Sequence, residues 1–167
     1  METVLRFVLA IALSLLSTAF AAAGHATTRG ATVLDAVTAR ELAAVMAEFG
    51  YDIELKDENG PALVTRRGET KFTIRFYGCD KNPDVSRRIC GDAQFRSSYN
   101  LPDAASLNLM NKWNNEFRFG KAYVNGEGRA TVEMTINLDG GVTKSYLHSL
   151  LKWWGLVLRD FEAYIGW

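Results

Sequence analysis

The sequence contains very few of the residues on which most catalytic and metal sites depend. Its 167 residues include only two histidines, His25 and His148, and two cysteines, Cys79 and Cys90. Zinc sites usually need several His or Cys ligands, so the composition argues against zinc. Nucleophilic catalysis needs a base that reaches the nucleophile. His25 lies at the end of an apolar N-terminal segment, and we interpret His148 as a residue on the flank of the last predicted helix.

Familiar catalytic motifs are missing as well. There is no G-x-S-x-G and no glycine-rich phosphate loop, and we interpret Gly140-Gly141 as a turn. Asp and Glu are plentiful, but no spacing singles out a pair for acid–base chemistry. We therefore predict that the protein is not an enzyme and uses no cofactor.

The chain also lacks a net charge, because 19 Lys and Arg balance 19 Asp and Glu. A protein without a positive excess gains little electrostatic attraction to a phosphate backbone, so nucleic acid is not an expected partner. The remaining composition, 48% hydrophobic and 23% charged, is that of an ordinary globular protein. Its length predicts one domain.

The sequence has one long apolar run, and it lies near the N-terminus. Arg6 precedes the uncharged segment Phe7–Phe20, and small residues follow at Ala21–Ala23. This order is typical of a secretory signal peptide, so we predict a leader over residues 1–26 that is cleaved after about residue 23 to 26. The alternative is an uncleaved anchor, although the run is short for a span of about 20 residues. Cleavage would place the protein in the periplasm or outside the cell.

The rest of the chain predicts alternating helices and strands. After a flexible lead-in over residues 27–36, a helix begins at Thr38, which forms a capping box with Glu41. Period-2 alternation then predicts three or four sequential strands, and these are followed by a helix, two strands and a last helix. The prediction is a single α+β domain over residues 37–167, in the order α-β-β-β-(β)-α-β-β-α, with helices packed on an antiparallel sheet.

The two cysteines have ten residues between them, in the stretch "GCDKNPDVSRRICGD". In an exported protein they most simply form a disulfide that closes a strand connection. A catalytic redox pair would more typically have C-x-x-C spacing. Asp80, Asn82 and Asp84 match the first three ligand positions of a calcium loop, but its later glycine and glutamate are missing. We interpret these three residues as a polar loop tip and as weak candidates for a metal site.

The second half of the chain is rich in aromatic residues and contains all four tryptophans. Trp153 and Trp154 are adjacent on the last predicted helix, so they cannot both face the same side. Aromatic residues and arginine are enriched in protein-binding hot spots. The candidates for partner binding are Trp113, Asn114, Arg118, Phe119 and Tyr123.

Several segments resemble the YbjN-domain family of bacterial proteins, which are often labelled sensory transduction regulators. The segments are "KWNNEFRFGKAYV" and "VEMTINLDGGV", with "EFGYDIEL" and "FYGC" nearer the N-terminus. The resemblance covers roughly residues 37–165. It implies a fold like that of type III secretion chaperones and a binding or regulatory role rather than catalysis. It carries over no active-site residues.

These patterns together predict an exported, non-enzymatic module that binds a protein or peptide through its sheet and its aromatic second half. An alternative from another class is a cation- or small-ligand-binding module that uses Asp80, Asn82 and Asp84. A membrane is not an expected partner unless the leader stays uncleaved. Formation of a homodimer is kept as an alternative.

Overall fold

The computed structural model describes residues 33–34, 37–57, 59–103 and 105–167. The expected leader over residues 1–26 and most of the expected lead-in lie outside the described residues. Among the helices that are described, none is long and apolar enough to cross a membrane.

The described part of the chain forms three α-helices, eight strands and one short 3-10 helix. In chain order they are β1 (Val33–Leu34), α1 (Ala39–Ala47), β2 (Ile53–Asp57), β3 (Pro61–Arg67), β4 (Thr70–Tyr77), η1 (Val85–Arg87), β5 (Asp92–Tyr99), α2 (Leu107–Glu116), β6 (Lys121–Val124), β7 (Ala130–Asn137), β8 (Val142–Thr143) and α3 (Lys144–Ile165).

Six of the strands form one sheet in the order β2-β3-β4-β5-β7-β6, and all neighbours in it are antiparallel. The predicted α+β class and the predicted order of elements are confirmed, with β5 as the optional fourth strand of the first group. The sequence patterns did not predict β1 and β8, which form a separate pair. Val33 of β1, within the expected lead-in, lies opposite Thr143.

The first helix begins where local chemistry predicts it. The Thr38 backbone N–H donates to the Glu41 carboxylate at 2.8 Å, and the Glu41 N–H donates to the Thr38 hydroxyl at 3.2 Å. This reciprocal capping satisfies two N–H groups that the first turn of a helix leaves without partners. Leu42 and Met46 then face the core from α1, one turn apart.

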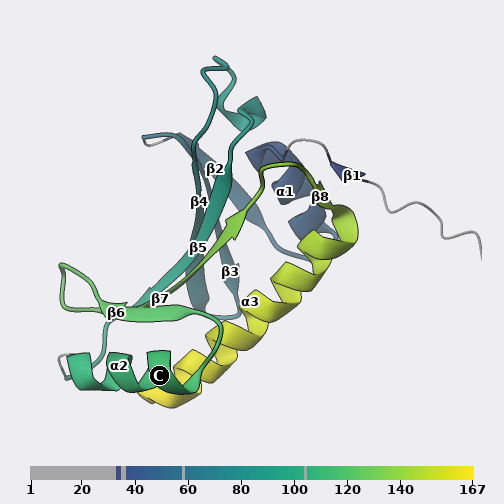
Figure 1. The fold of residues 1–167 in the computed structure, drawn as a ribbon. Coiled ribbons are helices and arrows are strands. Elements are labelled where there is room, and N and C mark those ends of the chain that lie inside the picture. Colours follow the sequence, from purple (N-terminus) through teal and green to yellow (C-terminus); the bar gives the residue numbers. More distant parts are fainter. Residues whose placement is uncertain (1–32, 35–36, 58, 104) are drawn as a thin grey trace, which may run out of the picture.

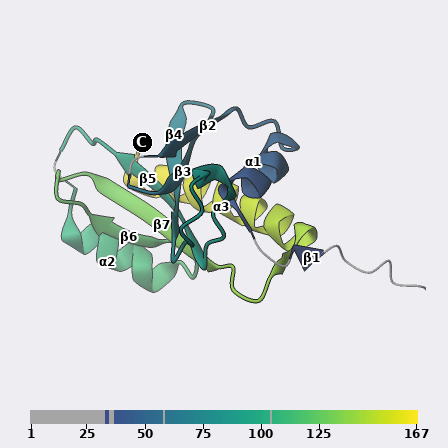
Figure 2. The ribbon, with the colours of Figure 1, turned by 90° about the horizontal axis from the view of Figure 1, so that it is seen from above.

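The two faces of the sheet differ in what covers them. On β4, Phe72 and Ile74 are buried, whereas Lys71 and Arg75 on the alternate positions are exposed. Figure 1 shows α3 running diagonally across the buried side, and Figure 2 shows α1 beside it. Among the described helices, none covers the opposite face, which we call the uncovered face (Figure 1).

Aromatic rings connect α2 to the C-terminal half of α3. Trp113 of α2 stacks on Phe117 with ring centroids 3.8 Å apart, and it meets Phe161 of α3 edge-on at 5.0 Å. Trp154, nearer the middle of α3, contacts Phe95 of β5 at 5.6 Å. The packing holds α2 beside β6, where the predicted partner-binding residues lie (Figure 1).

Candidate functional site

Trp113, the first predicted partner-binding residue, belongs to the core. Its side chain is fully buried, and its indole Nε1–H donates to the Gly120 carbonyl oxygen at 2.6 Å. Gly120 has φ of 82° and lies so close to α3 that an added Cβ would come within 2.7 Å of a Val157 methyl group. The ring therefore fixes the loop between α2 and β6, and it is a core residue rather than an exposed one.

Asn114, the second predicted residue, closes one edge of the sheet. Its side-chain amide donates to the Ala122 carbonyl oxygen at 2.9 Å, and its side-chain oxygen accepts from the Ala122 N–H at 2.8 Å. β6 is the last strand on that side, so its outward backbone groups would otherwise be free to pair with another strand. Asn114 occupies the place that a neighbouring strand would take.

Arg118 and Phe119 lie at the surface, next to the outer side of α3. The Phe119 and Trp153 rings are 4.7 Å apart and are 38% and 42% exposed, and the Arg118 guanidinium lies 5.0 Å from the Phe119 centroid. Leu156, one turn further along α3, is 37% exposed. We call Arg118, Phe119, Trp153 and Leu156 the aromatic patch. It surrounds a hollow of about 140 Å³ whose floor includes Trp113 and Val157.

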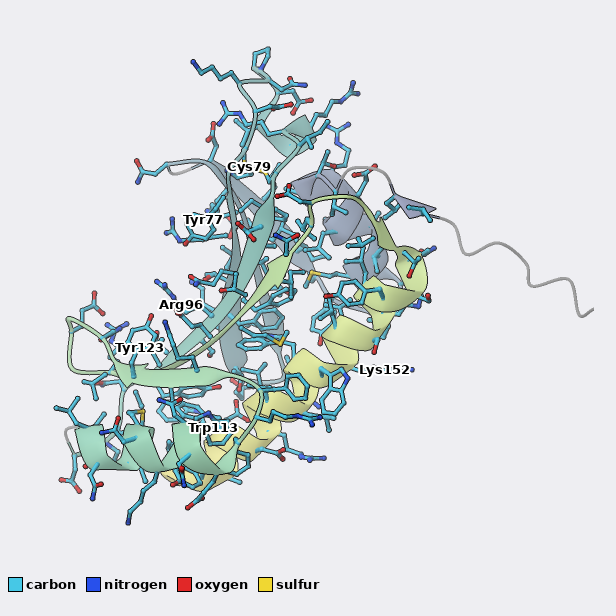
Figure 3. The ribbon with its side chains drawn as sticks, in the orientation of Figure 1. Tyr77, Cys79, Arg96, Trp113, Tyr123 and Lys152 are labelled. Carbon is cyan, nitrogen blue, oxygen red and sulfur yellow. A yellow bond between two sulfur atoms is a disulfide. The ribbon has the colours of Figure 1, made fainter. Side chains whose placement is uncertain are left out.

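Tyr123, the last predicted residue, lies on the uncovered face and takes part in a hydrogen-bonded network around Glu133. The Tyr123 hydroxyl donates to the Glu133 carboxylate at 2.9 Å, Arg96 donates at 3.0 Å, and Lys121 pairs with the other oxygen at 2.8 Å. Figure 3 shows Tyr77, Arg96 and Tyr123 on this side of the sheet, and Lys152 on the far side of α3.

Electrostatics hold the Glu133 network in one protonation state. Burial alone would favour the neutral acid, but the hydrogen bonds from Lys121, Tyr123 and Arg96 outweigh it and hold the pKa of the Glu133 carboxyl below its ordinary value. Burial, together with the hydrogen bond to Glu133, raises the pKa of the Tyr123 hydroxyl. At neutral pH the network therefore contains a carboxylate and a neutral phenol.

The structure brings three of the five predicted residues together, because Trp113, Arg118 and Phe119 line one hollow. Asn114 and Tyr123 lie elsewhere, in separate hydrogen-bonded contacts. Only Arg118 and Phe119 form part of an exposed apolar surface, and that these residues bind a partner stays a prediction. Sequence reasoning missed Leu156 as their neighbour. The signal was present, since residues 153 and 156 are three apart and lie on the side of α3 opposite the buried Leu158.

Cys79 and Cys90 form a disulfide across the ends of β4 and β5. The connection between them folds back onto α1: Arg40 donates to the Ser86 hydroxyl at 2.7 Å, and Ile89 forms an isolated β-bridge with Thr38. The disulfide therefore closes a loop that also contacts the beginning of α1.

The loop residues considered as metal ligands accept hydrogen bonds from the backbone. The Asp80 side chain accepts from the Asn82 N–H, Asn82 from the Asp84 N–H, and Asp84 from the Ser86 N–H, each at 3.0 Å. The hydrogen bond from the Ser86 hydroxyl is the main cause that lowers the pKa of the Asp84 carboxyl. The other Asp84 oxygen pairs with Arg40 and Arg87, each at 3.3 Å. Within the described residues, no three His, Cys, Asp or Glu side chains are grouped as a metal would need.

His148 lies on α3 and contacts the two residues that directly follow α1. Its Nε2 is 3.2 Å from the Glu48 carboxylate, and its ring meets Phe49 edge-on at 4.9 Å. Lys144 also pairs with Glu48, and the hydrogen bond from Lys144 is the main cause that lowers the pKa of the Glu48 carboxyl. His148 thus takes part in an exposed connection between α1 and α3, in agreement with the interpretation as a helix-flank residue.

The fold and surfaces define a small α+β module with one sheet face covered by helices and one uncovered. The YbjN family model, described as "Putative bacterial sensory transduction regulator", matches residues 38–167. The match covers more than half of the chain, so the protein belongs to the YbjN family, as the sequence resemblance predicted. No curated protein and no solved structure matches the chain. The likeness to type III secretion chaperones stays a prediction.

Proposed function

We propose that this protein is an exported, non-enzymatic regulatory module that binds a protein partner through the aromatic patch. The observation that carries the proposal is the contact between Phe119 and Trp153, two large rings in mutual contact that stay about two-fifths exposed beside a hollow. The family description supports a regulatory role, and a regulator without a reaction of its own has to act by binding.

The shape and chemistry of the patch indicate what the partner presents. A hollow of about 140 Å³ has room for one large apolar side chain, and burying such a side chain contributes roughly 1.5–3 kcal/mol. Arg118 and Asp160 also line the hollow and place one positive and one negative charge beside it. A matching partner carries an apolar anchor residue flanked by polar groups. Aromatic and Arg residues around a central pocket are also the composition of binding hot spots.

Site-specific crosslinking tests the binding site. A photo-crosslinking amino acid at Leu156 is expected to give a discrete protein adduct in the native host, and Phe119→Ser in the same chain should abolish the adduct. Leu107 is a matched control, because it is a leucine at the N-terminal end of α2 that is 70% exposed and outside the patch. The Leu107 position should not give this adduct. The proposal fails if both positions give the same adducts, or if Phe119→Ser leaves the adduct unchanged while the variant melts like the wild type.

Export is part of the proposal and has a test of its own. The Cys79–Cys90 disulfide supports it, because disulfides persist mainly in oxidising compartments. Mass spectrometry of the periplasmic fraction should find a chain cleaved after about residue 23 to 26, lighter by two hydrogens than its reduced form. A full-length, reduced chain in the cytoplasm would contradict export, and it would leave the crosslinking test unaffected.

A further inference from the structure

The uncovered face carries a cluster of positive charges that the aromatic patch does not explain. In the register of the sheet, Thr73 lies opposite Arg96, and Lys71 and Arg75 are two residues to either side of Thr73 on the same face. Diagonal neighbours of this kind are within reach of long side chains. Arg66 joins the cluster from β3, where it lies directly opposite Lys71. We call Arg66, Lys71, Arg75 and Arg96 the cationic cluster.

The charges of the cluster are only partly balanced. Arg96 pairs with Glu133, and Arg66 donates to the Glu69 carbonyl oxygen, which is neutral. Among the described residues, no carboxylate lies within ion-pair distance of Lys71 or Arg75. The carboxylates in register on this face have other partners, because Glu133 pairs with Arg96 and Lys121, and Glu54 pairs with Lys56. The positive excess is therefore local to Lys71 and Arg75.

The arrangement works against the stability of the sheet. Like charges directly opposite each other on neighbouring strands are destabilising, and Arg66 and Lys71 form such a pair. Solubility alone would be served by charges of mixed sign. The repulsion among these positive charges raises the free energy of the isolated fold. An anionic ligand bound at the cluster would relieve that repulsion.

Two hollows in the surface are lined by residues of the cluster. Lys71, Arg96 and Arg129 line a hollow of about 240 Å³ together with the hydroxyl groups of Thr73 and Ser98. Lys71 and Thr73 also line a neighbouring hollow of about 250 Å³ that extends to Arg75. Cationic groups interspersed with hydroxyl donors suit an oxyanion in each hollow.

We propose that the uncovered face binds an acidic, extended peptide segment of a partner protein, independently of the aromatic patch. Two hollows that share Lys71 and Thr73 fit successive carboxylate side chains on one strand of peptide. A flat anionic membrane would not enter recessed hollows. Nucleic acid is less suited, because Phe72, the one aromatic residue that lines either hollow, is buried and offers no ring for base stacking. The net charge of zero also gives no long-range attraction to a phosphate backbone.

Fluorescence anisotropy with a labelled peptide of alternating glutamate and serine tests this proposal on the purified exported chain. Lys71→Glu with Arg75→Glu should weaken binding about tenfold or more, and added salt should weaken wild-type binding, because the attraction is electrostatic. Lys152→Glu is the matched control, since Lys152 is an exposed lysine on the far side of α3 (Figure 3). Lys152→Glu and Phe119→Ser should both bind the peptide like the wild type.

Several outcomes would overturn the proposal. One is absence of binding at low salt, and another is equal weakening by Lys152→Glu and by the Lys71/Arg75 double variant. Tighter binding of single-stranded DNA, or of phosphatidylglycerol vesicles, than of the peptide would assign the face to another class of ligand. Thermal melting of each variant separates lost binding from lost folding. Phe119→Ser leaves the uncovered face intact. A failure of the peptide-binding proposal can therefore be told apart from a failure of the proposal that the aromatic patch binds a partner.

Discussion

At the residue scale, Glu133 is the side chain whose ionisation matters most to the uncovered face. Its carboxylate is buried and accepts from Lys121, Tyr123 and Arg96. Because its folded-state pKa is lowered, its contribution to stability is present above the unfolded pKa of about 4.3. The contribution is lost as the pH falls through the lower folded-state pKa.

Glu133→Gln should therefore reduce both stability and its dependence on pH. We expect the free energy of unfolding at pH 7 to fall by about 1–2 kcal/mol, since the partners Lys121 and Arg96 are partly solvated and the loss is correspondingly limited. Below pH 4 the difference from the wild type should shrink. Urea titrations across this range measure it. Glu127→Gln, at an exposed ion pair with Arg129, is the control and should change stability little. If the free energy of unfolding of Glu133→Gln were lower than that of the wild type by the same amount at every pH, the explanation through ionisation of Glu133 would be wrong.

At the scale of elements, the contact between α2 and the edge of the sheet depends on one side chain. Asn114 satisfies both the N–H and the C=O of Ala122. Asn114→Ala leaves these groups without partners, so we expect a loss of about 1–2 kcal/mol in the free energy of unfolding. Asn115→Ala, at the neighbouring position that is also exposed but makes no contact with Ala122, should be almost neutral. Equal losses in the two variants, measured by urea titration, would show that helix propensity and not the edge contact is responsible.

The second prediction at this scale concerns the connection between β4 and β5. The disulfide joins residues 11 apart in sequence, and closing a loop of this size stabilises by roughly 3 kcal/mol in the chain-entropy model. Replacing Cys79 and Cys90 by serine should lower the melting temperature, and a reducing agent should lower that of the wild type to a similar value. A reducing agent that also destabilised the double variant would point to another cause. The bridge between Ile89 and Thr38 means that the beginning of α1 should loosen as well.

At the scale of the whole molecule, local patterns predicted the elements better than they predicted the surfaces. The capping box of Thr38 and the alternation through Phe72 and Ile74 are encoded in a few consecutive residues, and both are present in the structure. β1 and β8 escaped prediction because each has two residues, and its partner lies more than a hundred residues away in the chain. No local pattern reports such a pairing.

The surfaces depend on packing and on register, which sequence periodicity does not specify. Trp113 and Phe119 look equally suitable for binding in the sequence, but only the packing of α2 against α3 decides that the first is buried and the second exposed. Likewise Arg66 and Lys71 stand near each other in sequence, while Arg96 joins them through the pairing of β4 with β5. Charge balance over the full chain concealed this local excess.

The unequal edges of the sheet limit how copies of the molecule can assemble. Asn114 and α2 close the β6 edge, whereas no described strand pairs with the outer side of β2, where Leu55 is 45% exposed. Two molecules that met through β2 would complete one continuous sheet and leave no further edge for a third. Association of this kind ends at a pair and does not propagate into fibres. Asn114 thus limits association through the sheet edges to two copies, and opening the β6 edge would remove that limit.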